Sequence, residues 1–162
     1  MIIALISNGS EKNIINKKEI PIVRSDRGGQ VTYHGPGQLV VYFLLNIKRL
    51  GWGPKKLIFY LEEIFIRLIS QYNIKAKRKE GAPGIYVADK KIASIGLKIK
   101  QGFSYHGVSL NVDMNLSPFD DINICGYKAL EATQINDLAS ASIEQIKEDL
   151  KSLLEDRSFK TA

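Results

Sequence analysis

Cysteine, histidine and tryptophan are scarce in this 162-residue chain, which has one cysteine, two histidines and one tryptophan. A single cysteine excludes an intramolecular disulfide, and this set of residues leaves no zinc-site spacing. No apolar run reaches the roughly 18 to 20 residues that a membrane span needs, and no secretory signal opens the sequence. We therefore expect a cytoplasmic protein without membrane contact. Its lone Cys125 is either a buried filler or a nucleophile.

The composition is that of a folded globular protein. Hydrophobic residues make up 44% of the chain and charged residues 25%, with no internal repeat and no low-complexity tract. This length suits one domain over residues 1–162 and is short for two.

Positive charge is in excess, with a formal net charge of +6 and a pI near 9.3. The basic residues are scattered, apart from a denser cluster at Lys75, Lys77, Arg78 and Lys79. No aromatic platform is interleaved with that cluster, so we expect no nucleic acid partner. Most of the charge is expected to be solvated surface, and steering of an acidic protein partner is the next interpretation.

Residues 27–38 read RGGQVTYHGPGQ and form the densest motif of the chain. Glycines allow positive φ and close approach of a ligand, and proline stiffens the turn. A tight loop without a ligand is the plain alternative. The interleaved Arg27, Gln30, Tyr33 and His34 favour a walled pocket instead.

The hydrophobic pattern predicts an α/β (α+β) fold with a mixed sheet and packed helices. Pro54 begins the clearest helix, and Ser142 is placed to cap a second one. Apolar runs predict strands at 1–6, 20–23 and 105–112, and a hairpin of 85–87 with 92–99. The run 39–47 has almost no polar residue and predicts a central strand buried on both faces. Less regular structure is expected at 7–10 (turn), 11–19 (short helix or surface loop), 116–124 (loop) and 136–139 (helical turn).

The motif at 27–38 resembles the signature of the lipoyl(octanoyl) transferases. Two further segments resemble the same family in the same order: KIASIG at 91–96, and HGVSLNV at 106–112 followed by LSPF at 116–119 and Cys125-Gly126. The resemblance implies a fold like that of the biotin and lipoate protein ligases.

The resemblance also implies a reaction. An octanoyl group would pass from octanoyl-acyl carrier protein to a lysine of a lipoyl domain, as the first step of protein lipoylation. The acceptors would be the lipoyl domains of 2-oxoacid dehydrogenase complexes and the glycine cleavage H protein. Cys125 would carry the acyl thioester, while Lys91 would favour its thiolate and move a proton. No metal, ATP or other cofactor is expected.

The family's binding positions transfer to three segments of this chain. They are Arg27, Gly28, Gly29, Gln30, Val31, Thr32, Tyr33 and His34, then Ser94, Ile95 and Gly96, and then Gly107, Val108 and Ser109. Val31, Ile95 and Val108 are expected to contribute to an apolar slot for the octanoyl tail. Backbone amides in the glycine-containing turns are expected to hold the thioester oxygen as its charge builds.

The chain departs from the family at two places. Ile124 replaces the usual proline before the cysteine, which we expect to loosen the loop that aims the sulfur. Family members also have several dozen more residues before the position of Met1, forming a helix and a strand, and a different turn where this chain has Ser7 to Ser10. Either the true protein is longer, or this is a shortened enzyme.

Two alternatives stay open on the sequence. A lipoate or biotin ligase of the same fold would activate its acid with ATP and would not need Cys125. A truncated non-catalytic protein would bind acyl carrier protein or nucleic acid and form no covalent intermediate. Taken alone, Lys91 reads as a surface lysine, while His34 and His106 fit a hydrogen-bonded structural role and a functional role equally well.

Overall fold

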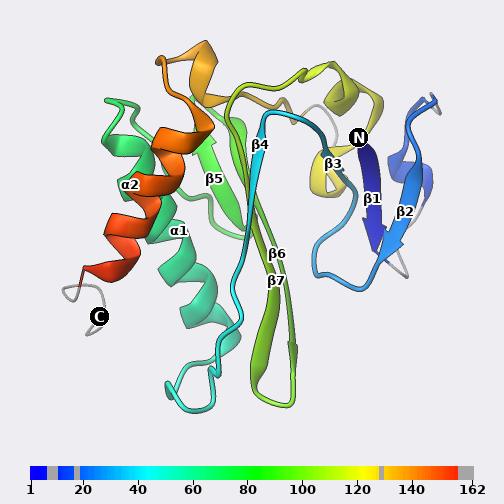
Figure 1. The fold of residues 1–162 in the computed structure, drawn as a ribbon. Helices are drawn as coiled ribbons and strands as arrows, with labels where there is room; N and C mark the ends of the chain where they lie inside the picture. Colours follow the sequence, from blue (N-terminus) through cyan, green and yellow to red (C-terminus); the bar gives the residue numbers. More distant parts are fainter. Residues whose placement is uncertain (7–10, 17–18, 128–129, 157–162) are drawn as a thin grey trace.

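The structure, a computed structural model, describes residues 1–6, 11–16, 19–127 and 130–156. It contains a four-stranded sheet with two α-helices on one face and a three-stranded sheet beyond its other face (Figure 1). The α+β class predicted from the sequence is confirmed, although the strands form two sheets and not one. The predicted turn at 7–10 lies outside the described residues.

The four-stranded sheet has the order β4-β7-β6-β5, and all its neighbours are antiparallel. Its strands are β4 (Gln38–Tyr42), β5 (Gly84–Val87), β6 (Lys90–Lys100) and β7 (Phe103–Asn111). The predicted hairpin is β5 and β6, joined by Ala88 and Asp89, which both have positive φ. A second tight turn at Gln101 and Gly102 joins β6 to β7.

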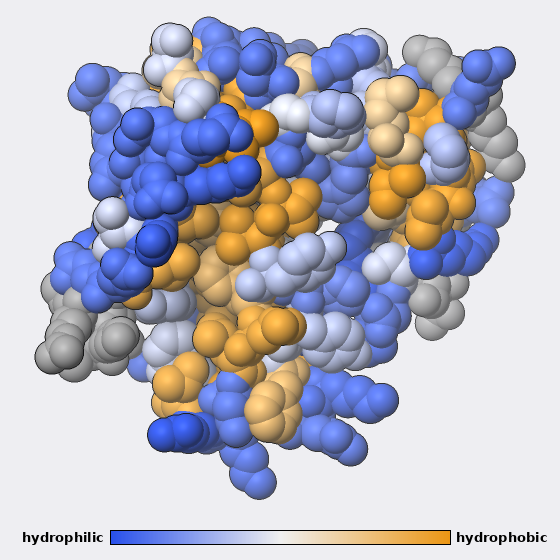
Figure 2. All heavy atoms as spheres, viewed as in Figure 1, coloured by the Kyte–Doolittle hydropathy of each residue, from blue (hydrophilic) through white to orange (hydrophobic). Residues whose placement is uncertain are grey.

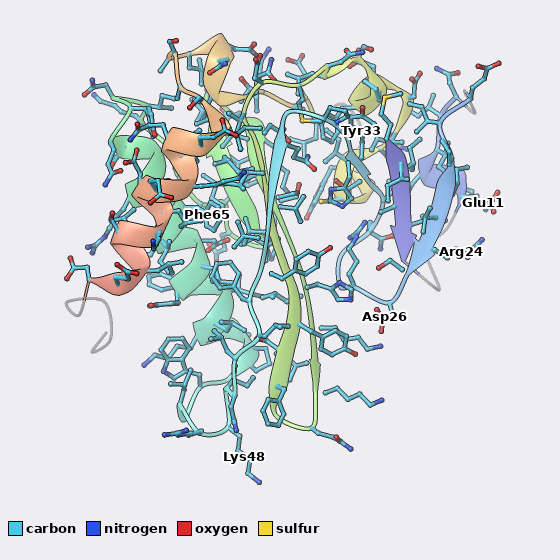
Figure 3. The ribbon with its side chains drawn as sticks, viewed as in Figure 1. Glu11, Arg24, Asp26, Tyr33, Lys48 and Phe65 are labelled. Carbon is cyan, nitrogen blue, oxygen red and sulfur yellow. The ribbon has the colours of Figure 1, made fainter. Side chains whose placement is uncertain are left out.

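Two helices cover one face of this sheet (Figure 1). The helix α1 (Pro54–Ser70) has proline in its first turn, as predicted, because the fixed φ of proline suits a helix start. The helix α2 (Ile143–Glu155) is capped by Ser142, whose Oγ accepts from the Gln145 amide at 3.1 Å. Apolar side chains of both helices join the sheet in the main core, and Phe65 lies between α1 and the sheet (Figure 3).

The three-stranded sheet has β1 (Ile2–Ile6) at its centre. It pairs in parallel with β2 (Ile22–Ser25) and antiparallel with β3 (Thr32–His34). Short 3-10 segments take the place of long helices in this part of the chain: η1 (Glu11–Asn13), η2 (Ser117–Asp121) and η3 (Ile124–Gly126), with η4 (Ile135–Asp137) further along. A separate core cluster joins β1 and β3 to these segments, through residues such as Leu5, Tyr33, Phe119 and Ile124.

The prediction of a central strand at 39–47, buried on both faces, is wrong. The strand β4 covers only Gln38–Tyr42 and lies at the edge of its sheet. Alternate side chains leave the core, so that Val40 is 40%, Tyr42 65% and Leu44 75% exposed. The buried face of the run comes from Leu39, Phe43 and Ile47, because successive side chains of an extended chain point to opposite sides.

Apolar side chains also reach the surface. On the face seen in Figure 2 they form a band over β4 and a second group over β1. Across the described ranges, no helix is both long and apolar enough to cross a membrane.

Candidate active site

Lys91 and Cys125 lie 34 positions apart in the sequence and meet in the structure. Lys91 Nζ is 3.1 Å from Cys125 Sγ and donates a hydrogen bond to the Pro83 carbonyl at 3.0 Å. The amine also lies 5.3 Å from the ring centroid of Tyr86. Lys91 is only 2% exposed, and among the described residues it pairs with no carboxylate. A buried amine beside a thiol is an arrangement that suits a reactive cysteine.

The backbone of β6 holds Lys91 in place. Lys91 pairs with Tyr86 of β5 on one side. On the other side its amide donates to the Glu131 carbonyl at 2.8 Å, and its carbonyl accepts from the Thr133 amide at 3.0 Å. The lysine therefore comes from a strand that is hydrogen-bonded on both edges at this position.

Cys125 sits in the middle of the 3-10 turn η3 with φ 53° and ψ 23°, in the left-handed region. That conformation costs a residue other than glycine about 1–2 kcal/mol, and such strain is typical of functional turns. The Cys125 amide donates to the Val31 carbonyl at 3.2 Å, which ties the turn to the motif at 27–38. Ile124 is fully buried in the second core cluster and so anchors the turn.

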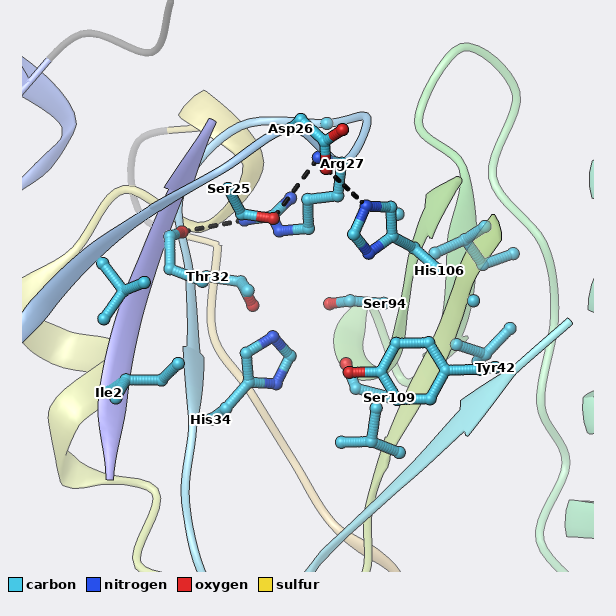
Figure 4. Close-up of a pocket in the computed structure, with 18 of the residues that line it drawn as sticks. Ile2, Ser25, Asp26, Arg27, Thr32, His34, Tyr42, Ser94, His106 and Ser109 are labelled. Carbon is cyan, nitrogen blue, oxygen red and sulfur yellow. Dashed lines mark hydrogen bonds and ion pairs between the residues drawn. The ribbon is translucent and has the colours of Figure 1, made fainter. Parts of the chain in front are cut away.

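A cavity of about 570 Å³ lies between the two sheets (Figure 4). Cys125 is one of the residues that line it. The three-stranded sheet and the loop after β2 contribute Ala4, Arg27, Gly29, Thr32 and His34, among others. The four-stranded sheet contributes Val40, Tyr42, Ser94, Ile95, Gly96, His106, Gly107, Val108 and Ser109. We refer to this space as the first cavity.

Two of the segments that the sequence marked as binding positions are direct neighbours in the sheet. Ser94, Ile95 and Gly96 of β6 stand opposite Ser109, Val108 and Gly107 of β7. Both segments line the first cavity, as does Cys125. Two segments that are separate in the sequence therefore form one wall of the cavity.

The motif at 27–38 contains the strand β3, which the sequence interpretation missed. Thr32 and His34 face the first cavity, whereas Val31 and Tyr33 are fully buried in the second core cluster. This alternation is the period of a strand. The side chains of Val31 and Tyr33 consequently lie away from the cavity, although both were expected as binding positions.

Arg27 fastens the loop before β3. Its guanidinium donates to the carbonyls of Gly28, Ala4 and Gln30. Its Nε is buried and has no partner among the described residues, and the same is true of Thr32 Oγ1. Burial lowers the pKa of Arg27, and the nearby charge of Cys125 acts in the opposite direction. A second cation therefore lies within electrostatic reach of the sulfur.

His34 belongs to a partly buried polar network. Its Nδ1 is 2.7 Å from Gln38 Oε1, while Gln38 Nε2 donates to Asn111 Oδ1 at 2.8 Å. Asn111 in turn donates to the Thr133 carbonyl at 3.0 Å. Because the Gln38 oxygen accepts, His34 carries its proton on Nδ1. Burial lowers the pKa of His34, the hydrogen bond with Gln38 partly opposes that effect, and the Arg27 charge adds to it. His34 is thus held as a neutral ring in the cavity wall (Figure 4).

Asp26 forms an exposed bridge across the rim of the first cavity, and nothing in the sequence indicated it. Asp26 accepts from Lys98 Nζ and from His106 Nε2, each at 2.8 Å. These bonds hold the pKa of Asp26 at about 2, below its usual value. The bridge joins the loop after β2 to β6 and β7 (Figures 3 and 4).

A smaller cavity of about 220 Å³, which we call the second cavity, shares Cys125, Gly29 and Ile95 with the first. Its other lining residues are Gly28, Gln30, Ile58, Ala82, Pro83, Lys91, Leu97 and Tyr127. Gly28 and Gln30, which were expected as binding positions, line this cavity and not the first. Glycine at position 28 allows this loop to pack closely against Leu97 of β6, since a Cβ at Gly28 would be 2.3 Å from the Leu97 carbonyl oxygen.

Within the part of the chain that the structure describes, no three His, Cys, Asp or Glu side chains gather in a way that could hold a metal ion.

Comparison with known proteins places the chain in a family. Residues 8–155 match the model of the lipoyl protein ligase A/B catalytic domain. The chain is 48% identical over 143 residues to an octanoyltransferase of Vibrio atlanticus, covering 88% of this chain and 65% of that protein. It is 45% identical over 152 residues to an octanoyltransferase of Acinetobacter baylyi, covering 93% and 69%. The chain thus spans about two thirds of the length of these relatives.

The fold has solved counterparts as well. A lipoate protein ligase from Thermoplasma acidophilum with bound lipoic acid superposes with a TM-score of 0.73 and 14% identity, covering 94% of this chain and 66% of that chain. At that identity the likeness concerns the fold alone.

Proposed function

This chain belongs to the lipoyl protein ligase A/B catalytic domain family, among its octanoyltransferases, and we propose that it is itself an octanoyltransferase. In this proposal it moves an octanoyl group from octanoyl-acyl carrier protein to a lysine of a lipoyl domain. The observation that carries the proposal is the 3.1 Å contact between Lys91 Nζ and the Sγ of Cys125, a residue that lines the first cavity.

The first half of the reaction loads the cysteine. The Cys125 thiolate attacks the carbonyl carbon of the donor thioester, the bond from that carbon to the donor sulfur breaks, and the carrier leaves as a thiol after taking up one proton. The Lys91 ammonium stabilises the attacking thiolate through a charge-assisted contact. The Arg27 guanidinium adds positive charge at longer range.

The second half of the reaction transfers the octanoyl group from Cys125 to the acceptor lysine. A neutral lysine amine attacks the carbonyl carbon of the Cys125 thioester, and the bond between carbon and sulfur breaks. The amine loses one proton and the sulfur gains one, so the products are an amide and the free thiol. Lys91 lies where it can pass that proton, because its Nζ already contacts the sulfur.

The acyl chain is assigned to the first cavity, which is the larger of the two and has Ile95 and Val108 in its wall. Of the three residues expected to form the octanoyl slot, these two line the cavity, whereas Val31 is buried behind it. The volume of about 570 Å³ lies within the range usual for small-molecule sites.

The test is the intact mass of the protein after it is mixed with octanoyl-acyl carrier protein. We expect a gain of one octanoyl group that hydroxylamine removes, that Cys125→Ala lacks, and that forms without ATP. Lys91→Gln should keep the fold and load at least about a hundredfold more slowly. Transfer that requires ATP and survives Cys125→Ala would identify a ligase. A folded protein that gains no octanoyl group would contradict the proposal for this chain.

A further inference from the structure

Cys125 lines two cavities, and its partner Lys91 lines only one of them. The first cavity contains the cysteine without the lysine, whereas the second contains both. The mechanism above uses Lys91 to move the proton of the attacking amine. The amine must therefore reach the thioester from the side on which Lys91 Nζ is accessible.

We propose that the second cavity is the entry channel for the acceptor lysine side chain, so that acyl chain and nucleophile approach Cys125 from opposite sides. The inference rests on the proposed function and names the subsite of its second substrate. The two cavities meet at Cys125, Gly29 and Ile95. A thioester carbonyl on Cys125 would lie at this junction, within reach of both.

The walls of the second cavity fit a lysine stem. Ile58, Ala82 and Leu97 are apolar, and the volume of about 220 Å³ suits a single narrow chain. An unbranched aliphatic stem can bury itself along such a surface while its nitrogen reaches the polar end. Among the described residues, the titratable groups in the lining are Lys91, Cys125 and Tyr127. With no carboxylate in that lining, an ammonium would be repelled there and a neutral amine, the reactive form, favoured.

The same walls fit the donor's amide-bearing arm poorly. Amides that leave water need hydrogen-bond partners. In the second cavity, Gln30 already contacts Asn13 Nδ2 at 3.5 Å, and the Tyr127 hydroxyl donates to the Gly81 carbonyl at 3.2 Å. The first cavity instead has the unpartnered Thr32 Oγ1 in its wall.

The experiment narrows one cavity at a time and measures loading and transfer separately. Cys125 is loaded with S-octanoyl-N-acetylcysteamine, excess donor is removed, and single-turnover transfer to a lipoyl domain is followed by mass. Ile58→Trp narrows the second cavity from α1, and Ala82→Leu narrows it from the turn before β5. Phe59→Trp is the matched control, because Phe59 is the next residue of α1, is 54% exposed and lines neither cavity.

Ile58→Trp is expected to load within about twofold of the unmodified chain and to transfer at least about tenfold more slowly. Aminolysis of the loaded protein by hydroxylamine, which is small, should be nearly unchanged. Val23→Trp, in the exposed wall of the first cavity, should show the reverse: slow loading with octanoyl, and normal transfer once loaded. Ala82→Leu should follow Ile58→Trp and supports the assignment if the tryptophan variant does not fold.

Three outcomes would overturn the inference. Normal transfer by both second-cavity variants would exclude the channel while leaving the octanoyltransferase proposal intact. Loading that slows as much as transfer in Ile58→Trp would assign the cavity to the carrier arm or the acyl chain. If the unmodified chain acquires no octanoyl group at all, the proposed function itself fails, and the inference fails with it.

Discussion

The two sheets of this protein are stabilised in different ways. The four-stranded sheet is backed by α1 and α2, and its long strand β6 pairs on both sides. The three-stranded sheet is backed by short 3-10 segments, and its edge strand β2 has no buried residue. Lys91 comes from the first of these sheets, whereas Cys125 and the strand β3 belong with the second.

This difference separates two requirements of the site. A lysine that is buried without a carboxylate needs a rigid strand to hold it, because it would otherwise turn toward water. The cysteine lies on a turn in a left-handed conformation, which a smaller cluster holds through Ile124 and the Val31 carbonyl. We expect the helix-backed sheet to set global stability and the smaller sheet to set the geometry at the sulfur.

The largest expected effect compares one phenylalanine from each core. Phe65→Ala should lower the free energy of unfolding by about 3–5 kcal/mol, since Phe65 is fully buried between α1 and its sheet. Phe119→Ala removes an edge-on contact with Tyr33, whose ring centroid is 5.4 Å away. Phe119→Ala should lower the free energy of unfolding in urea by less than Phe65→Ala does. For each kcal/mol of stability lost, it should slow Cys125 loading more than Phe65→Ala does. Equal losses of stability with normal loading in Phe119→Ala would contradict the division between the sheets.

The second prediction concerns the space that holds Lys91 against the sulfur. A Cβ at Gly84 would lie 2.5 Å from Lys91 Cε and 2.9 Å from the Ala93 carbonyl oxygen, and Gly84 has φ +141°. Gly84→Ala should therefore displace the lysine and slow Cys125 loading at least about tenfold. Because the displaced Lys91 amine would stabilise the Cys125 thiolate less well, the loss should appear in the single-turnover loading rate.

Gly81→Ala is the matched control, because Gly81 also has positive φ, at +71°, but a Cβ there would meet nothing within 4 Å. It should cost about 1 kcal/mol of stability from backbone strain and leave the loading rate unchanged. Equal loading by both variants would show that Lys91 is not held by the lack of a side chain at Gly84.

The sequence predicted one of these two regions better than the other. The spacing of apolar residues in α1, the helix start at Pro54, the cap at Ser142 and the β5–β6 hairpin follow from local rules, and all are confirmed. The prediction that the run 39–47 is a central strand was wrong because apolar composition does not reveal that one face of an edge strand meets a cavity. The strand β3 was hidden by its glycine-rich flanks, although the alternation of Val31, Thr32, Tyr33 and His34 was a signal for it.

The sequence could indicate which residues form the site, but not how close together the fold brings them. Family resemblance indicated Lys91 and Cys125, yet their contact depends on β6 pairing with residues 131–133 and on the η3 turn, which no local pattern encodes. Asp26 belongs to none of the sequence motifs. Its bridge to Lys98 and His106 exists only because the loop after β2 folds back over β6 and β7.

The third prediction uses pH to separate buried from exposed polar groups. Burial keeps the pKa of His34 below its ordinary value of 6.5, so the unfolded chain binds a proton more readily than the native one. The stability contributed at this site should be full above pH 6.5 and fall as the pH is lowered through 6.5. Urea unfolding at pH 7.5 and 5.5 should show this loss in the unmodified chain and less of it in His34→Gln.

His106→Gln is the matched histidine variant, because it leaves the His34 network untouched and should keep the loss between pH 7.5 and 5.5. If His34→Gln has the same pH dependence as the unmodified chain, the ring is not held neutral by burial.

The smallest expected effect is at Asp26, whose bridge joins the two sheets at the surface. The pKa of Asp26 is lowered to about 2, so its contribution should be present above pH 3.8 and be lost as the pH falls toward 2. Water and salt screen an exposed pair of this kind, so Asp26→Asn should change the melting temperature only slightly at pH 6 and less still at high salt. Asp120→Asn, another exposed aspartate, is the control. A large loss for Asp26→Asn that persists at 1 M salt would show that the smaller sheet depends on this bridge for its position, and the comparison between the sheets would then rest on charge as well as on packing.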